Sequence, residues 1–164
     1  MRYYAGVDPG ATGGVVVLNE DGVLIGIWDT GGFPGWSGLV SMVVEQQHAF
    51  PNITATTNFK MGQGSGYWRG WCRALGIGLE EVSAGKWQRA ICGTLPRERK
   101  AKKKAICEWA RRRWPQFADR FVGPRGAVLD GLSDAACIAL YAVRLGQGTD
   151  LLAREAGGEA SDGV

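Results

Sequence analysis

The sequence from Tyr4 to Leu18 reads YAGVDPGATGGVVVL and decides the fold. Its first apolar run ends at Asp8, a turn of proline and glycines follows, and a second apolar run completes the segment. The pattern predicts two antiparallel strands, residues 3–8 and 14–19, joined by a tight turn. An acid at the end of a strand is held rigidly enough to bind a metal ion. The alternative is an Asp-Pro-Gly turn in which the carboxylate only accepts local backbone hydrogen bonds.

The rest of the chain alternates between apolar segments and breaks rich in glycine, proline and charge. Strands are expected at 23–28, 39–45 and 80–83, loops at 29–38 and 49–58, and helices at 59–75, 84–92, 99–113 and 127–145. Gly62, Gly66 and Gly70 are expected to let the first of these helices pack closely. Strands first and helices afterwards predict a layered α/β domain with helices on the faces of its sheet.

Length and composition are those of one globular domain. The chain has 164 residues, 45% of them hydrophobic and 21% charged. No segment approaches the ~20 apolar residues that span a bilayer, and Asp8 interrupts the apolar run that a signal peptide would need. We therefore expect a cytoplasmic protein without a membrane partner, whose folded domain covers residues 1–145. Residues 146–164, with a net charge of −3, are expected to form a disordered acidic tail.

The cysteines show no pattern of a metal site. Cys72, Cys92, Cys107 and Cys137 are widely spaced and form no Cys-x-x-Cys pair. His48 is the only histidine, so a zinc site is not expected. The spacing favours buried free thiols in a reducing compartment.

A strongly basic segment lies in the second half of the chain. Residues 86–113 contain eleven Lys and Arg against two acids, Glu98 and Glu108, which gives the segment a net charge of +9. The whole chain carries only +3. This density exceeds that of an ordinary solvated helix face and predicts a polyanionic partner, for which nucleic acid is the obvious candidate.

Four carboxylates are candidates for a metal site. Asp8 ends the first strand, and Glu45 ends the strand at 39–45. Asp130 and Asp134 stand four residues apart in an otherwise apolar helix, so they share one helix face, one turn apart. Oxygen-only sites of this kind suit Mg²⁺ or Mn²⁺, and two such ions ~4 Å apart can activate water for phosphodiester cleavage.

Three of these acids also have structural interpretations of their own. Asp130 suits a helix N-cap, which is compatible with metal binding. Glu45 could be a surface polar residue that follows a strand. For Asp134 the structural interpretation is weak, because an acid within an apolar helix costs stability.

Six motifs follow one another along residues 3–145. They are Asp8-Pro9-Gly10, Glu45-Gln46-Gln47-His48-Ala49, the stretch from Asn58 to Gly66, Trp87-Gln88-Arg89-Ala90, the lysines before Trp114-Pro115, and Asp130-x-x-x-Asp134-Ala135. This ordered set resembles RuvC-type Holliday junction resolvases, most closely the phage and organellar branch. The resemblance implies an RNase H-like fold, which is a mixed five-stranded sheet with helices on its faces. It also implies a homodimer that nicks four-way, branched DNA with Mg²⁺ and without a small-molecule cofactor.

Site residues follow from the resemblance motif by motif. The four metal-binding and catalytic acids correspond to Asp8, Glu45, Asp130 and Asp134. A catalytic lysine near the scissile phosphate corresponds to Lys103 or its neighbour Lys104. Further contacts with DNA are expected from Lys60, Arg69, Lys86, Arg89, Lys100, Lys102 and Lys104.

Two rings after the second acid are expected at the centre of the junction. His48 and Phe50 offer flat surfaces on which unpaired bases can stack. The alternative is that Phe50 and Phe59 pack on the core and that His48 is merely exposed.

The chain departs from the resembling family at two places. The family usually has a helix between the third and fourth strands, where only residues 29–38 are available here. The sheet that such a helix would cover must be hidden by loop residues such as Phe33 and Trp36, or by a partner. Leu129 stands where relatives often carry a histidine, which weakens a general-base role there but leaves the metal ligands unaffected.

Two other functions compete with the nuclease. A catalytically silent RNase H-like protein could coat branched DNA, but a pure binder gains nothing from acids that face phosphate. The Asp8-Pro9-Gly10 turn also resembles the phosphate turn of actin-like sugar kinases. Those enzymes need two such domains, and 164 residues are too few.

Overall fold

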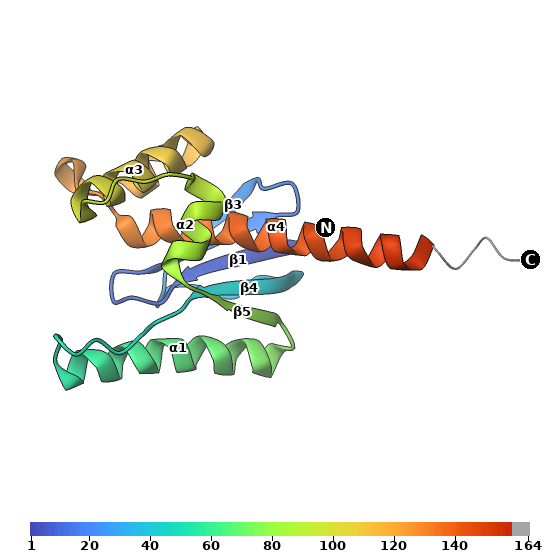
Figure 1. Cartoon of the computed structure of the whole chain (residues 1–164), viewed down its shortest axis with the longest axis horizontal. Coiled ribbons are helices and arrows are strands. Elements are labelled where there is room, and N and C mark those ends of the chain that lie inside the picture. The colour runs from blue at the N-terminus through green and yellow to red at the C-terminus, as the bar shows by residue number, and fades with distance from the viewer. Residues whose placement is uncertain (159–164) are drawn as a thin grey trace, which may run out of the picture.

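A five-stranded mixed sheet with helices on both faces forms the protein (Figure 1). The computed structural model describes the backbone of residues 1–158 and the side chains of residues 1–124 and 126–148. The strands are β1 (Tyr3–Asp8), β2 (Gly14–Asn19), β3 (Leu24–Asp29), β4 (Leu39–Glu45) and β5 (Gly78–Val82). The α-helices are α1 (Ala55–Leu75), α2 (Ala84–Cys92), α3 (Arg99–Arg113) and α4 (Asp130–Gly158), with short 3₁₀ helices at Pro115–Phe121 and Pro124–Gly126.

The strands lie in the order β3-β2-β1-β4-β5. The first three form an antiparallel meander, and β4 and β5 run parallel to β1. All five expected strands are confirmed to within two residues at each end. The α/β prediction with helices on the faces of a mixed five-stranded sheet is therefore confirmed.

Helix boundaries differ more from the expectations. Helix α1 starts at Ala55, inside the segment expected to be a loop, because the hydroxyl of Thr54 caps it by accepting a hydrogen bond from Thr57 N at 3.2 Å. Helix α4 starts at Asp130 and continues past Leu145 to Gly158. The expected disorder is therefore wrong for residues 146–158, which are helical, whereas residues 159–164 lie outside the described residues and their disorder stays a prediction.

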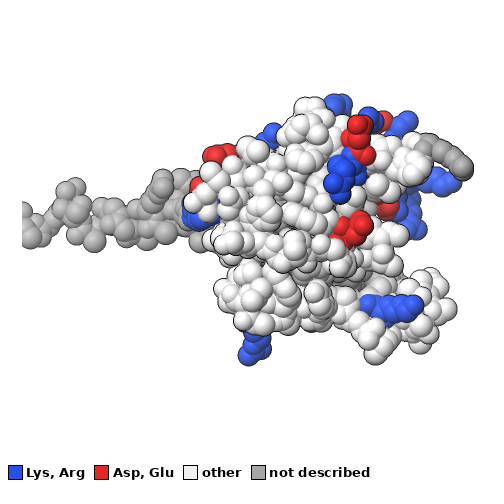
Figure 2. Space-filling model, turned by 180° about the vertical axis from the view of Figure 1, so that it is seen from behind, with Lys and Arg blue, Asp and Glu red and all other residues white. Residues whose placement is uncertain are grey.

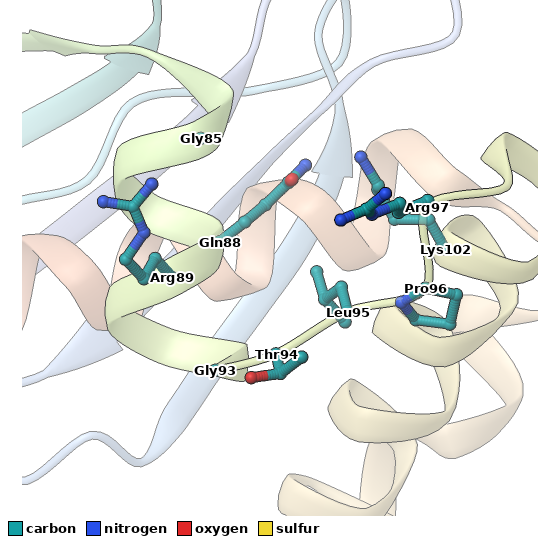
Figure 3. Close-up of a pocket in the computed structure, with 9 residues that line it drawn as sticks. All are labelled: Gly85, Gln88, Arg89, Gly93, Thr94, Leu95, Pro96, Arg97 and Lys102. Atoms are coloured by element: carbon teal, nitrogen blue, oxygen red, sulfur yellow. The ribbon is translucent and has the colours of Figure 1, made fainter.

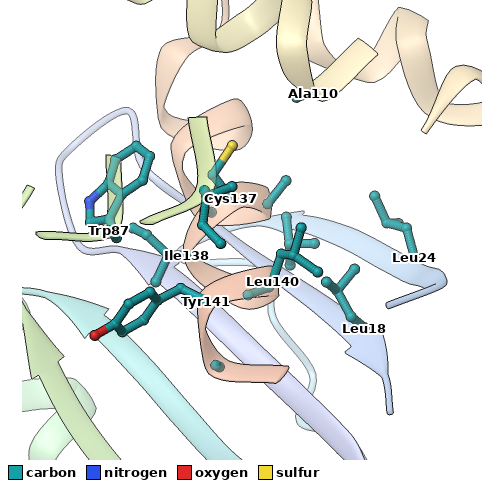
Figure 4. Close-up of a cluster of buried hydrophobic side chains, with 14 of the residues drawn as sticks. Leu18, Leu24, Trp87, Ala110, Cys137, Ile138, Leu140 and Tyr141 are labelled. Carbon is teal, nitrogen blue, oxygen red and sulfur yellow. The ribbon is translucent and has the colours of Figure 1, made fainter. Parts of the chain in front are cut away.

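Alternating side chains divide the core into two layers. Above the sheet in Figure 1, Tyr4, Val16 and Val43 pack against α2, α3 and α4. Figure 4 shows this layer, with Trp87 of α2 against Ile138 of α4 and with Leu140 near Leu18 of the sheet. On the other face, α1 packs against the sheet. Since Ala5 and Val7 face α1, Asp8 faces the α4 side.

The loop between β3 and β4 covers the sheet where the family usually has a helix. Phe33 lies edge-on to Trp28 with ring centroids 5.3 Å apart and also contacts Trp71 at 5.6 Å. Trp36 contacts Trp28 at 5.7 Å. The expectation that Phe33 and Trp36 hide this patch is confirmed, and the aromatic layer joins the loop to α1.

The cysteines are free thiols, as expected. Cys72, Cys107 and Cys137 are buried, and Cys92 is half-buried. None of the helices in the described part of the chain has both the length and the apolar content that a membrane crossing requires.

The expected close packing of Gly62, Gly66 and Gly70 is wrong. A Cβ at any of the three would have no neighbour within 4 Å, because these positions face away from the sheet. The close contact occurs at Gly64 instead, where a Cβ would lie 3.0 Å from the carbonyl oxygen of Pro9. Helical periodicity alone did not indicate which face of α1 meets the sheet.

Gly6 in β1 sets the approach of α4. A methyl group there would overlap the backbone of Ala135, Ile138 and Ala139. Gly6→Ala is therefore expected to force α4 away from the sheet and to destabilise the fold by about 1–3 kcal/mol or more, as measured by urea unfolding. The matched control is Gly62→Ala, where the added methyl meets nothing and helix propensity favours alanine by ~1 kcal/mol. Equal stabilities of the two variants would contradict the close contact.

Candidate active site

Four acids from distant parts of the chain lie at one end of the sheet, within electrostatic reach of one another. Asp8 and Glu45 are the last residues of β1 and β4, which are parallel neighbours, so their carboxyl ends lie side by side. Asp130 opens α4 and Asp134 follows one turn later. We call these four residues the carboxylate cluster.

The start of α4 is held directly against the turn after β1. Gly131 packs on the backbone of Thr12 and Gly13 so closely that no side chain would fit. Two residues before Asp8 in β1, Gly6 lets the next turns of α4 touch the strand. These two contacts bring Asp130 and Asp134 to the end of the strand that carries Asp8.

Hydrogen bonds position two of the acids. An oxygen of Asp8 accepts a hydrogen bond from Gly10 N at 2.9 Å, as the Asp-Pro-Gly turn interpretation expected. Oε2 of Glu45 accepts one from the indole Nε1 of Trp87 at 2.9 Å. Glu45 is thus fixed within the site, and its interpretation as a mere surface residue is wrong.

Lys103 contacts the third acid. Its ammonium group forms an ion pair with the carboxylate of Asp130, and both side chains are about one-third exposed. Lys104 instead pairs with Glu108 on the same helix, at 3.9 Å and well exposed. Of the two lysines that the resemblance offered, Lys103 is therefore the one beside the carboxylate cluster.

Asp134 has the most strongly raised pKa in the carboxylate cluster. Its Oδ1 is buried and has no hydrogen-bond partner among the described residues. Burial, with smaller contributions from the charges of Glu45, Asp8 and Asp130, raises the pKa of Asp134 to about 8. Lys103 opposes this rise.

Glu45 and Asp8 are perturbed in the same direction. Burial raises the pKa of Glu45 to about 7, against the hydrogen bond from Trp87 and with a smaller contribution from the charge of Asp8. Burial also raises the pKa of Asp8, and the Gly10 amide opposes that rise. Buried acids whose pKa values are raised in this way are typical of functional sites.

The oxygen donors of the carboxylate cluster suit hard divalent cations. All four donors are carboxylates, which Mg²⁺ and Mn²⁺ prefer. A cation would neutralise their mutual repulsion and satisfy the unpaired oxygen of Asp134. Within the described side chains, no three His, Cys, Asp or Glu residues stand close enough to hold an ion as they are. Coordination therefore requires the carboxylates to turn toward each other.

The expected DNA-binding residues fall into two groups. Three of them are ion-paired: Arg69 to Glu81, Lys86 to Glu80, and Lys104 to Glu108. The other four form no ion pair with any acid among the described side chains: Lys60, Arg89 and Lys100, which are exposed, and Lys102, which is half-buried. In the view of Figure 2, Lys and Arg gather on the side of α3, while most of that face is uncharged.

The rings after β4 lie on the surface. Phe50 is 50% exposed and Phe59 is 67% exposed, so the alternative that they pack on the core is wrong. His48 is exposed as well. Asn58 braces this loop, because its side chain exchanges two hydrogen bonds of 3.0 Å with the backbone of Phe50.

Trp87 is the site residue that sequence reasoning missed. It was noted only as part of the Trp87-Gln88-Arg89-Ala90 motif, without a role. The structure shows its buried indole bonded to Glu45, 42 residues away in sequence. The available signal was a tryptophan in a short helix next to charged residues, which does not indicate what the indole bonds to.

The protein is similar to known proteins in fold but not recognisably in sequence. No protein-family model matches the chain, and no curated protein is significantly similar to it. Solved structures are similar. RuvC of Thermus thermophilus in complex with a Holliday junction substrate superposes with a TM-score of 0.62 at 16% identity, over 91% of this chain and 98% of that chain. The chain has the RuvC fold.

A second RuvC structure agrees. Thermus thermophilus RuvC matches with a TM-score of 0.53 at 21% identity and covers 90% of this chain and 97% of that chain. At identities this low, the likeness establishes the fold alone. The RNase H-like architecture implied by the motifs is therefore confirmed, and activity has to be argued from the carboxylate cluster.

Proposed function

We propose that this protein is a divalent-metal-dependent endonuclease that nicks four-way DNA junctions by phosphodiester hydrolysis. The observation that carries the proposal is the meeting of Asp8, Glu45, Asp130 and Asp134 beside Lys103 on a RuvC fold. A RuvC of this fold has been seen in complex with a Holliday junction substrate, which supports branched DNA as the substrate class.

Each member of the site has a proposed role. The four carboxylates hold Mg²⁺, or Mn²⁺ in its place, and bound ions of this kind supply an activated water and stabilise the leaving oxygen. Trp87 holds Glu45 in position through its indole hydrogen bond. Lys103, which forms an ion pair with Asp130, would contact the scissile phosphate and offset its charge.

Nicking of synthetic junctions tests the proposal. With Mg²⁺, the protein should nick a four-way junction at least about tenfold faster than linear duplex of the same sequence, and EDTA should stop the reaction. The products, mapped to the nucleotide on a denaturing gel, show whether cuts cluster at the crossover. Tight junction binding without any nicking under Mg²⁺ or Mn²⁺ would support the catalytically silent binder instead.

We also propose a homodimer, as the resemblance to RuvC-type resolvases implies. A four-way junction presents equivalent strands in pairs, so two copies related by a two-fold axis can each place one carboxylate cluster on a strand. Light scattering of the purified protein, with and without junction, measures the mass. A monomer in both states would contradict the proposal.

We further propose that His48 and Phe50 stack on bases unpaired at the junction centre. Their exposure leaves both rings free to do so, and each stacked base contributes ~1–3 kcal/mol. His48→Ala and Phe50→Ala should therefore weaken the 2-aminopurine fluorescence change at the crossover while duplex affinity stays nearly constant. The matched control is Tyr67→Ala, an exposed ring on α1. Equal losses on junction and duplex would contradict stacking.

A further inference from the structure

A polar pocket lies between α2 and α3, the two helices that also carry Trp87 and Lys103. Its volume is about 450 Å³, and its lining includes Gln88, Arg89, Thr94, Arg97 and Lys102. Figure 3 shows Gln88 of α2 and Arg97 of the connecting segment pointing toward each other, with Lys102 beside Arg97 and Leu95 below. Gln88, Arg97 and Lys102, from three consecutive segments, thus line one hollow, while the guanidinium of Arg89 points to the other side of α2.

The three cations of this pocket differ from most others near the site. Lys86, Lys103 and Lys104 each lie within 4 Å of a carboxylate oxygen, which balances their charge. Arg89 and the other two pocket cations have no such contact with any acid among the described side chains. Their positive charge is therefore available to a ligand.

The nearest acid in sequence does not neutralise the pocket. Glu98 directly follows Arg97, but its carboxylate caps α3 by accepting hydrogen bonds from Lys100 N at 2.9 Å and Ala101 N at 2.6 Å. These bonds lower the pKa of Glu98, so it stays committed to the helix end. A ligand that occupies the pocket must then be an anion with several acceptor oxygens, because the lining offers guanidinium, ammonium, amide and hydroxyl donors.

Lys102 links the pocket to the carboxylate cluster. It lines the pocket, while the next residue, Lys103, contacts Asp130. Successive residues on a helix point about 100° apart, so the two side chains serve neighbouring positions. A DNA strand whose scissile phosphate lies at Lys103 would bring another of its phosphates to Lys102.

We infer that this pocket binds a backbone phosphate of the cleaved DNA strand, close to the scissile phosphate but outside the carboxylate cluster. The inference rests on the proposed function, because it takes DNA as the ligand. Arg97 is the principal contact, with Lys102 and Arg89 adding charge and Gln88 adding an amide donor. The pocket orients the strand and carries no sequence information, since phosphates are the same at every position.

A methylphosphonate scan tests the contact. Junctions are prepared with one uncharged methylphosphonate at each position flanking the cleavage site, and binding is measured by fluorescence anisotropy in an Asp8→Asn background that prevents cleavage. The methylphosphonate at one position should weaken binding to the Asp8→Asn protein about fivefold. The same modification should leave binding to the Asp8→Asn/Arg97→Ala protein unchanged. Arg97→Ala itself should weaken binding about fivefold and reduce the salt slope by about 1.

The matched control is Arg73→Ala in the same background. It removes one positive charge from an exposed arginine in the last turn of α1, which packs on the opposite face of the sheet and lies outside the pocket lining. It should change affinity less than twofold and keep the full methylphosphonate effect. Circular dichroism melts verify that the exposed Arg97 is dispensable for folding.

The results separate this inference from the proposed function. If every methylphosphonate weakens binding by the same factor with and without Arg97→Ala, the pocket does not bind a phosphate, even if the wild-type protein nicks junctions. Alternatively, one position loses its methylphosphonate effect in the Arg97→Ala variant while the wild type does not nick any junction. That result would support the phosphate pocket and contradict the proposed nuclease activity. Absence of binding to any DNA would overturn both.

Discussion

Asp8→Asn is expected to lower junction nicking by a factor on the order of 10³ or more, while junction binding stays intact or becomes tighter. Asp8 lies at the end of β1, and its charge affects the pKa of both Glu45 and Asp134. It therefore lies within electrostatic reach of the acids from β4 and α4. The change removes one metal ligand and one negative charge that would face phosphate, so cleavage falls and affinity does not.

A matched variant shows that the effect belongs to the site. Asp29→Asn makes the same chemical change at the end of β3, on an exposed residue near the edge of the sheet. It should nick and bind like the wild type. Single-turnover cleavage and anisotropy binding, measured for both variants with Mg²⁺, distinguish the steps. Nicking by Asp8→Asn at near the wild-type rate would show that the carboxylate cluster is not the metal site.

Asp134→Asn is expected to abolish nicking and, in EDTA at pH 8, to stabilise the fold. Burial and the neighbouring acids raise the pKa of Asp134 to about 8, so ionising it in the metal-free protein is costly. Asparagine resembles the protonated acid and never ionises. Each unit of pKa shift corresponds to about 1.4 kcal/mol, and a gain of about 2–5 kcal/mol follows at pH 8. A rise in Tm of about 5–15 °C is expected for a domain of this size.

The predicted gain in stability depends on the pH range in which folded Asp134 holds its proton. Between the unfolded pKa, near 4, and the folded pKa, near 8, the native state holds a proton that the unfolded chain has released. Wild-type stability from this group is therefore fully present below pH 4 and declines as the pH rises to 8. The stability difference between Asp134→Asn and wild type should grow from nearly zero at pH 4 to its maximum near pH 8.

Urea unfolding at several pH values, with EDTA and then with Mg²⁺, measures this difference. Mg²⁺ should stabilise the wild type more than Asp134→Asn, because only the wild type has the complete set of ligands. Asp119→Asn is the control and should leave stability nearly unchanged, because Asp119 is exposed and its charge is not among those that shift the pKa of Asp134. A difference between Asp134→Asn and wild type that does not depend on pH would contradict the burial of an ionisable group.

Much of the fold follows from local patterns in the chain. The strand ending at Asp8, the turn after it and the next strand are recognisable because side-chain alternation and turn residues are local properties. The aromatic cover by Phe33 and Trp36 was predictable too, since a sheet face without a helix must be hidden by nearby apolar residues. The end of α4 was missed, because glycine-rich polar sequence does not by itself end a helix.

Local patterns in the sequence are enough to locate the acids at strand and helix ends and the basic charge in residues 86–113. The packing of elements distant in sequence, in contrast, determines that Lys103 rather than Lys104 contacts Asp130 and that Trp87 donates a hydrogen bond to Glu45. It also determines that Gly6, and not the glycine series of α1, makes the close backbone contact. Periodicity specifies the faces of one element, whereas the partner of each face depends on how elements far apart in sequence pack together.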